Sequence, residues 1–269
     1  MKKRTGFDII AKTILILVTL FLAMSMAVVV VGGIPFLGKA ICCDETLFAL
    51  RLSLVTASIS TILCFLLAIP SGYALTKCSM PFAKTIQTIL ELPLSLPNLV
   101  LGMCMLIMFS THFGKTLKLL GFRVVFDTKG IIIAQTVVNL PLAIRIIRTA
   151  FLEVDGRLEL IAGTLGASKW KRFLTITLPL SRRAIMAAAI LIWSRALGEF
   201  GATLMLVGAT RMKTETLPAS IYLYISTGEN GMAMASAILL MALSFLSITL
   251  TNYLNRTSKE RGHLRYEVY

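Results

Sequence analysis

Four long stretches of this chain contain no Asp, Glu, Lys or Arg, and they constrain its fold more than any other feature. They cover residues 13–38, 52–76, 92–114 and 230–255. Each is longer than the roughly 18–20 apolar residues that a helix needs to cross the hydrocarbon core of a bilayer. In hydrocarbon only helices and closed barrels satisfy every backbone hydrogen bond, and runs this long without alternation exclude a barrel. We therefore expect an all-α integral membrane protein.

The composition supports this interpretation. Hydrophobic residues make up 57% of the 269 positions and charged residues 15%, whereas soluble domains average about 45–50% and about 25%. These values disfavour a secreted disulfide scaffold, a nucleic-acid-binding protein and a cytosolic enzyme. The lipid bilayer, and not a nucleic acid, is the predicted partner of the long apolar surfaces.

Two further segments are apolar enough to cross although they contain charges. Residues 130–147 are uncharged as far as Arg145, and residues 184–208 are interrupted only by Arg195 and Glu199. The sequence thus predicts six transmembrane helices, which cover approximately 9–31, 51–75, 88–110, 130–149, 184–208 and 232–254. No other stretch has the length and apolar character of a span.

The first predicted helix follows three basic residues, as a secretory signal peptide would. Gly32-Gly33 could then imitate a cleavage site. The apolar run is longer than the 7–15 residues of a typical signal-peptide core. We therefore expect residues 9–31 to be retained as a transmembrane helix.

The distribution of Lys and Arg predicts the orientation of the helices. With a cytoplasmic N-terminus, eighteen of the 27 basic residues fall on the cytoplasmic side and seven in outer loops, while Arg51 and Arg195 lie at or inside spans. Cytoplasmic loops of membrane proteins carry an excess of Lys and Arg. Both termini are therefore predicted to be cytoplasmic. Much of the net charge of +14 then reflects topology and does not indicate an acidic substrate.

The longest cytoplasmic connection, residues 151–183, has the periodicity of two short helices. Apolar residues of the first share one stripe, namely Leu158, Ile161, Ala162 and Leu165. Asp155 suits the N-cap of this helix and Gly166 its C-terminal stop, and Pro179 is expected to end the second helix. Segments of about 11 residues are too short to cross. They are predicted to lie either on the membrane surface or in a groove of a partner protein.

The pattern Glu-x-x-Ala-x-x-x-Gly-Ala occupies residues 159–167, and Leu178-Pro179 follows about a dozen residues later. Together they resemble the cytoplasmic "EAA" loop of ABC-importer permease subunits, which is a coupling helix seated in a cleft of the ATP-hydrolysing subunit. The family's Glu-Ala-Ala aligns with residues 160–162, so the carboxylate of Glu159 stands one position early. The resemblance implies a role in ATPase coupling for Asp155, Glu159, Ala162, Gly166, Ala167 and Pro179.

Three other segments extend this resemblance. Residues 92–97 read Leu-Pro-Leu-Ser-Leu-Pro, residues 194–203 read Ser-Arg-Ala-Leu-Gly-Glu-Phe-Gly-Ala-Thr, and residues 216–222 read Thr-Leu-Pro-Ala-Ser-Ile-Tyr. They resemble the molybdate and sulfate branch of the same superfamily. The resemblance implies a type I ABC-importer permease fold with an extra transmembrane helix and outer loop (1–46), a five-helix core (47–255) that contains the coupling loop (151–183), and a cytoplasmic tail (256–269).

As a member of this branch, the chain would be the permease subunit of an ATP-driven importer for molybdate or tungstate in the cell membrane. It would form a homodimer that binds a dimer of ABC ATPase subunits inside and an oxyanion-binding protein outside. The resemblance places ATP hydrolysis on the partner, so this chain would not be an enzyme. Sulfate or another oxyanion is the alternative cargo, and an ATP-independent channel or a membrane enzyme is the alternative outside the family.

Two charges inside the fifth predicted span are candidates for the translocation path or its gate. Arg195 and Glu199 are four residues apart, so on one helix they would share a face and could pair. A lone charge at bilayer depth costs about 2.5–3.5 kcal/mol, so such groups normally face a cavity or a partner. Lining the path and locking the helix to its neighbours both remain open for this pair. Thr203, further along the segment, completes the candidate set.

The sequence predicts no catalytic, metal or cofactor site. The five cysteines form no C-x-x-C motif, although Cys42-Cys43 would face outward. Gly114-Lys115-Thr116 resembles the end of a nucleotide-binding loop, but Phe109 stands where its first glycine belongs. The outer loop around these residues is cationic, through Lys115, Lys118, Arg123 and Lys129. These charges could attract an anion or an acidic face of a binding protein, or simply be solvated.

Overall fold

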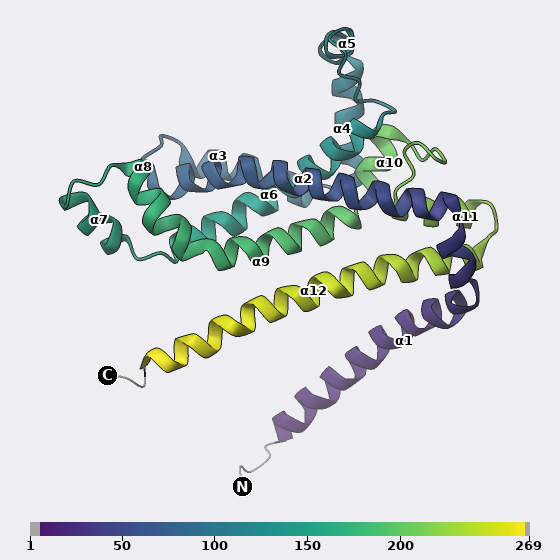
Figure 1. The fold of residues 1–269 in the computed structure, drawn as a ribbon, viewed down its shortest axis with the longest axis horizontal. Coiled ribbons are helices and arrows are strands. Elements are labelled where there is room, and N and C mark those ends of the chain that lie inside the picture. Colours follow the sequence, from purple (N-terminus) through teal and green to yellow (C-terminus); the bar gives the residue numbers. More distant parts are fainter. Residues whose placement is uncertain (1–5, 267–269) are drawn as a thin grey trace.

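The computed structural model describes residues 6–266 of the chain, and the side chains of residues 7–250. Every regular element in this part is helical (Figure 1). Five helical runs are long and apolar enough to cross a membrane. They are α1 (Gly6–Cys42), α2 (Asp44–Lys77), α6 (Thr128–Leu152), the run Lys169–Leu197 that ends with α9 (Leu178–Leu197), and α12 (Asn230–Tyr266). The predicted all-α, multi-pass membrane protein is confirmed.

Helices α2, α6 and α9 form the centre of the bundle. The buried face of α2 consists of small residues that recur every three or four positions, among them Ala49, Ser53, Thr56, Ala57, Ser60, Cys64, Ala68 and Gly72. Small residues let helix backbones approach closely, which matters in lipid because the hydrophobic effect does not drive helices together there. A Cβ atom on Gly72 would lie 2.8 Å from Cγ2 of Ile147 in α6. The small face of α2 therefore sets its distance from α6.

The predicted helix 88–110 is not continuous. It consists of α3 (Ala83–Glu91), the 3₁₀ turn η1 (Leu92–Ser95) and α4 (Asn98–Ser110), and the chain bends by 110° before α4. Pro97 explains the break, because a proline lacks an N–H and keeps the preceding residue extended, as it does Leu96 with ψ 141°. Counted as one span, the bent pair brings the number of crossings to the predicted six.

The predicted fifth helix, 184–208, begins earlier than expected. α8 (Lys169–Arg172), the π-turn η2 (Phe173–Thr177) and α9 form one continuous run. The prediction that a separate helix stops at Pro179 is wrong, because this proline lies in the first turn of α9. The π-turn accommodates its missing N–H, since the N–H of Leu178 donates to the carbonyl of Phe173, five residues earlier.

The same predicted helix also ends early. α9 stops at Leu197, residues 198–200 are not helical, and the chain then forms the short helix α10 (Gly201–Val207). α10 packs against α4, and a Cβ atom on Gly102 would lie 2.7 Å from Cα of Ala202. The two broken spans therefore present short half-helices to each other.

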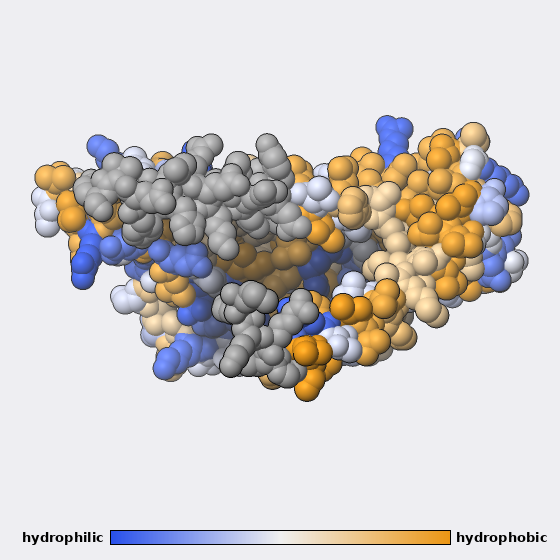
Figure 2. Space-filling view, turned by 90° about the horizontal axis from the view of Figure 1, so that it is seen from below, coloured by the Kyte–Doolittle hydropathy of each residue, from blue (hydrophilic) through white to orange (hydrophobic). Residues whose placement is uncertain are grey.

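α1 packs mainly against α12, outside the central bundle. Gly32 and Gly33 make the close contact, because Cβ atoms there would lie 2.3 Å from Sδ of Met234 and 2.9 Å from the backbone nitrogen of Ala235. Most other apolar side chains of α1 are exposed. Apolar residues also cover much of the right half of the face in Figure 2, as expected for a surface in contact with lipid or other membrane helices.

The two long outer helices diverge from the end of the bundle where α11 (Leu217–Ser226) lies (Figure 1). α12 ends on the side where α7 (Gly156–Thr164) lies, whereas α1 starts below the middle of the bundle. α12 continues as a helix through Tyr266, into the segment 256–269 that was expected to be a tail. α4 and the short helix α5 (His112–Leu119) project from the bundle.

Candidate functional site

The short helix that was predicted to begin at Asp155 and end at Gly166 exists, as α7. At its start, a side-chain oxygen of Asp155 accepts a hydrogen bond of 2.9 Å from the N–H of Arg157. At its end, Gly166 has φ +84° and the N–H of Ala167 donates to the carbonyl of Ala162, 2.9 Å away. This 6→1 bond beside a left-handed residue is the Schellman motif. The sequence predictions for both ends of the helix are confirmed.

The apolar stripe of α7 is not covered by this chain. Leu158 is 45% exposed, Ile161 57% and Leu165 83%. Leu160 is 68% exposed, and at about 100° per residue it lies on another side of the helix, at least about 140° from Leu158 and Leu165. Exposed large apolar residues that gather on one element mark a surface for a partner or a membrane.

Glu159 is the residue of α7 that faces the rest of the chain. Its Oε2 lies 3.2 Å from Nζ of Lys77, the last residue of α2, and its Oε1 accepts a hydrogen bond from the hydroxyl of Thr177. Its backbone carbonyl accepts a further bond of 3.2 Å from Nη1 of Arg172. The carboxylate is therefore engaged within the chain.

An aromatic cluster lies where α2, α6 and η2 meet. The ring of Phe173 lies 4.9 Å from that of Tyr73, 6.1 Å from that of Phe151 and 5.7 Å from that of Trp170, measured between centroids. Phe151 is fully buried. Edge-to-face ring contacts in this cluster help to hold together α2, α6 and η2, the elements that lie next to α7.

The six predicted coupling residues thus have different positions. Asp155, Gly166 and Ala167 shape the ends of α7, and Ala162 accepts the bond that closes it. Glu159 connects α7 to the bundle, whereas Pro179 belongs to α9.

The predicted pairing of Arg195 with Glu199 is wrong. α9 ends between them, so they do not share a helix face, and the ion pairs among the described residues do not include this one. Glu199 is 4% exposed and accepts hydrogen bonds from the N–H of Ala202, at 2.8 Å, and from Nδ2 of Asn98, at 2.7 Å. Glu199 therefore connects the two helix breaks, because it caps the start of α10 and also binds the side chain of Asn98, the first residue of α4.

Arg195 is exposed and bonded to α6. Its Nε donates to Oδ1 of Asn139 at 3.3 Å. Asn139 donates in turn to the carbonyl of Gln135, and Gln135 donates to the carbonyl of Ala196. Thr203 is 2% exposed, and its hydroxyl makes no hydrogen bond with the described residues. Of the three predicted path residues, only Arg195 reaches the surface.

Three amide side chains in this region were not predicted from the sequence. They are Asn98, Gln135 and Asn139, which bind Glu199, the carbonyl of Ala196 and Arg195. Gln135 and Asn139 carry a usable signal, because polar residues four apart in an apolar span normally face the bundle interior. Asn98 carries no such signal, because it directly follows Pro97 at a break between two helices.

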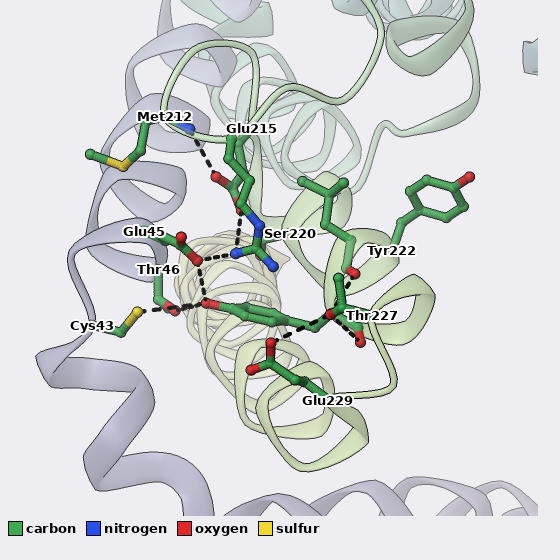
Figure 3. A network of polar contacts seen from close by, with 12 residues as sticks. Cys43, Glu45, Thr46, Met212, Glu215, Ser220, Tyr222, Thr227 and Glu229 are labelled. Atoms are coloured by element: carbon green, nitrogen blue, oxygen red, sulfur yellow. Dashed lines mark hydrogen bonds and ion pairs between the residues drawn. The ribbon is translucent and has the colours of Figure 1, made fainter.

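A second polar network (Figure 3) lies around α11, at the end of the bundle opposite to α7 (Figure 1). Arg211 forms an ion pair with Glu45 at the start of α2, and its Cζ lies 4.8 Å from the ring centroid of Tyr224 in α11. The hydroxyl of Tyr224 lies 3.2 Å from that of Thr46. Glu215, fully buried, accepts from the N–H of Met212 at 3.0 Å. These contacts join the loop after α10 to α2 and α11.

The described residues contain no group of three or more His, Cys, Asp or Glu side chains that could hold a metal ion. The arrangement instead combines Arg195, an exposed cation of α9 with no ion pair among the described residues, with the exposed apolar residues of α7 at one end of the bundle. Such a combination suits the transport of a solute better than catalysis.

Comparison with known proteins identifies similar sequences. Residues 60–260 match the family model described as "Binding-protein-dependent transport system inner membrane component". The chain is 36% identical to the molybdenum transport system permease protein ModB of Escherichia coli (strain K12) over 219 residues, which cover 80% of this chain and 95% of that one. It is 32% identical over 188 residues to the molybdate/tungstate transport system permease protein WtpB of Thermococcus kodakarensis, with 69% and 72% covered.

Solved structures show the same fold. A chain of a bacterial alginate ABC transporter, in complex with an alginate pentasaccharide-bound periplasmic protein, superimposes with a TM-score of 0.72 at 17% identity over 93% of both chains. A chain of the MetNI methionine ABC transporter in an inward-facing conformation gives a TM-score of 0.63 at 20% identity, with 79% of this chain and 95% of that one covered. The type I ABC-importer permease fold is confirmed.

The role of Glu199 at the two helix breaks can be tested by its removal. In Glu199→Ala, the N–H of Ala202 and the amide of Asn98 lose their acceptor, and a buried donor left unpaired costs about 1–3 kcal/mol. We expect the midpoint of thermal unfolding in detergent to fall by about 2–8 °C. Glu199→Gln keeps an acceptor oxygen and should lose less, while Glu153→Ala removes an exposed carboxylate and should lose nothing. Equal midpoints for Glu199→Ala and the unmodified chain would contradict this role.

Proposed function

Because the chain belongs to the family of binding-protein-dependent transport system inner membrane components, we propose that it is the permease subunit of an ATP-driven importer for molybdate or tungstate. The observation that carries the proposal is α7, a short helix capped at both ends whose apolar residues are exposed on more than one side. A helix that rests on lipid needs one apolar face. A helix held in a protein cleft can use several.

The partner of α7 is an ABC ATPase subunit, and a dimer of such subunits serves a homodimer of this chain. ATP hydrolysis takes place on the partner. Displacement of the two α7 helices by the ATPases opens and closes the path alternately to the two sides of the membrane. Both termini are cytoplasmic in this proposal, and the end of α12 on the side of α7 supports this for the C-terminal end (Figure 1).

Arg195 lines the anion path in this proposal. It is exposed on α9, lies inside an apolar run and has no carboxylate partner among the described residues, so its charge is available to a dianion. The bond to Asn139 holds its Nε and leaves the terminal nitrogens for a solute. Glu199 acts separately, as the structural link between α4 and α10.

The oxyanion reaches the chain from an external binding protein. Four exposed cations lie on or near α5, namely Lys115 and Lys118 in α5, Arg123 in the loop after it and Lys129 at the start of α6. α5 itself projects from the bundle, away from α7 (Figure 1). An acidic face of the binding protein complements this charge, and such complementarity speeds association.

The function is tested in proteoliposomes that contain the chain with its ATPase and the binding protein. We expect molybdate uptake that requires ATP, with competition by tungstate and weaker competition by sulfate. Preferential sulfate uptake would assign a different cargo. Flux through the isolated chain without ATP would refute the importer itself.

Substitution of Arg195 tests the path. Loss of one charged hydrogen-bonding group weakens an interaction by about 1.5–3 kcal/mol, which corresponds to about tenfold or more. Arg195→Ala should therefore lower ATP-driven molybdate uptake by about tenfold, and Arg195→Lys should retain part of it. Lys39→Ala, which removes an exposed cation at the end of α1, serves as the control. Normal uptake by Arg195→Ala would show that this residue is peripheral.

Gly166 tests the end of the coupling helix. Its φ of +84° is strained for any residue with a Cβ, by roughly 1–2 kcal/mol. In Gly166→Val we expect less ATPase to be retained on the affinity-tagged permease, while the membrane helices remain inserted. Gly156→Ala, at the other end of α7, has open space for its Cβ and should retain the normal amount. Full retention in Gly166→Val would contradict the importance of this turn.

A further inference from the structure

The side chain of Glu159 leaves α7 in a direction that the exposed apolar residues of this helix do not share. Leu158, Leu160 and Ile161 surround it in sequence and are 45%, 68% and 57% exposed, whereas the carboxylate side chain is 15% exposed. A surface carboxylate is normally solvated. The burial of this one requires partners, and the structure supplies them.

The partners of Glu159 belong to different helices. Lys77 is the last residue of α2, and its ammonium lies 3.2 Å from Oε2 with a side chain that is 16% exposed. Thr177 is the last residue of the π-turn η2 and is fully buried, and its hydroxyl donates to Oε1. A single carboxylate therefore joins α7 to the end of α2 and to the start of α9.

A third contact runs in the same direction. Nη1 of Arg172 donates to the backbone carbonyl of Glu159, and it lies 3.0 Å from the place of a Cβ atom on Gly163. The glycine thus leaves room for the guanidinium against α7. Among the described elements, α7 packs mainly against α8 and η2, to which Arg172 and Thr177 belong. The ion pair with Lys77 adds its connection to α2.

We propose that Glu159, with Lys77 and Thr177, is the linkage that transmits the displacement of α7 to α2 and α9. The inference rests on the proposed function, in which an ATPase moves α7. Glu159 is then a positioning residue that acts through the core helices and not a contact of the ATPase. The partial burial of the Glu159–Lys77 ion pair supports this positioning role, because salt screens a partly buried pair less than an exposed one. The apolar residues on the outer sides of α7 bind the ATPase, and the carboxylate on its inner side transmits the displacement to α2 and α9.

The test separates binding of the ATPase from its coupling to uptake. Molybdate uptake and ATP hydrolysis are measured together in proteoliposomes, and ATPase retention is measured on the tagged permease. Lys77→Met and Glu159→Gln should retain the ATPase but lower the uptake per ATP hydrolysed by about tenfold, within the 5–150-fold range typical of coupling between sites. Lys84→Met removes an exposed cation of α3 and should leave this ratio unchanged.

Exchange of the two charges tests the linkage itself, because a merely structural role would not predict recovery of uptake per ATP. In Lys77→Glu/Glu159→Lys the ion pair is reversed, and the Thr177 hydroxyl can accept as well as donate. We expect this double variant to recover uptake per ATP to within about threefold of the unmodified chain. Thr177→Val keeps the volume of a buried side chain and removes one bond, so it should fold normally and show an intermediate ratio.

Three results would overturn the inference. One is unchanged uptake per ATP in both single variants and in Thr177→Val. Another is loss of ATPase retention in Glu159→Gln but not in Lys77→Met, which would make the carboxylate a direct ATPase contact. The third is absence of recovery in the double variant. Failure of the proposed function is distinguishable, because the unmodified chain would then show no ATP-dependent molybdate uptake.

Discussion

The need of every backbone N–H and C=O for a partner inside hydrocarbon governs this structure. Long helices meet it automatically, and the chain departs from them at two breaks, before Asn98 and after Leu197. The same carboxylate acts at both breaks, since Glu199 accepts from the backbone N–H of Ala202 and also binds the side-chain amide of Asn98, the first residue of α4. The close contact of Gly102 with Ala202 then lets the two half-helices pack together.

This use of Glu199 has a consequence for charge. Glu199 is bonded to a backbone N–H and a side-chain amide and forms no ion pair with Arg195, which is bonded to Asn139 and remains exposed. Two charges four residues apart thus have separate tasks, one within the fold and one at a surface. An intramembrane cation without an ion-pair partner among the described residues is the feature expected along the path of an anion.

The surface helix α7 shows a comparable division of tasks. Its exposed apolar side chains point away from the chain, and its half-buried carboxylate points toward it, which is the reverse of an ordinary amphipathic helix. The reversal is understandable for a helix placed between two bodies. In the proposed function the ATPase binds exposed apolar residues such as Leu160 and Leu165, while Glu159 connects α7 to the helix bundle.

The sequence alone determined the features that depend on local chemistry. Long apolar stretches, four of them uncharged, predicted a helical membrane protein with six crossings, which the structure matches when the bent pair α3–α4 is counted as one span. The ends of α7 followed from Asp155 and Gly166, because caps form between near neighbours. Only the tertiary structure decided which prolines break a helix, since Pro97 ends one and the π-turn absorbs Pro179. It also decided the partners of Arg195, Glu199 and Glu159, because side chains far apart in sequence meet only when helices pack.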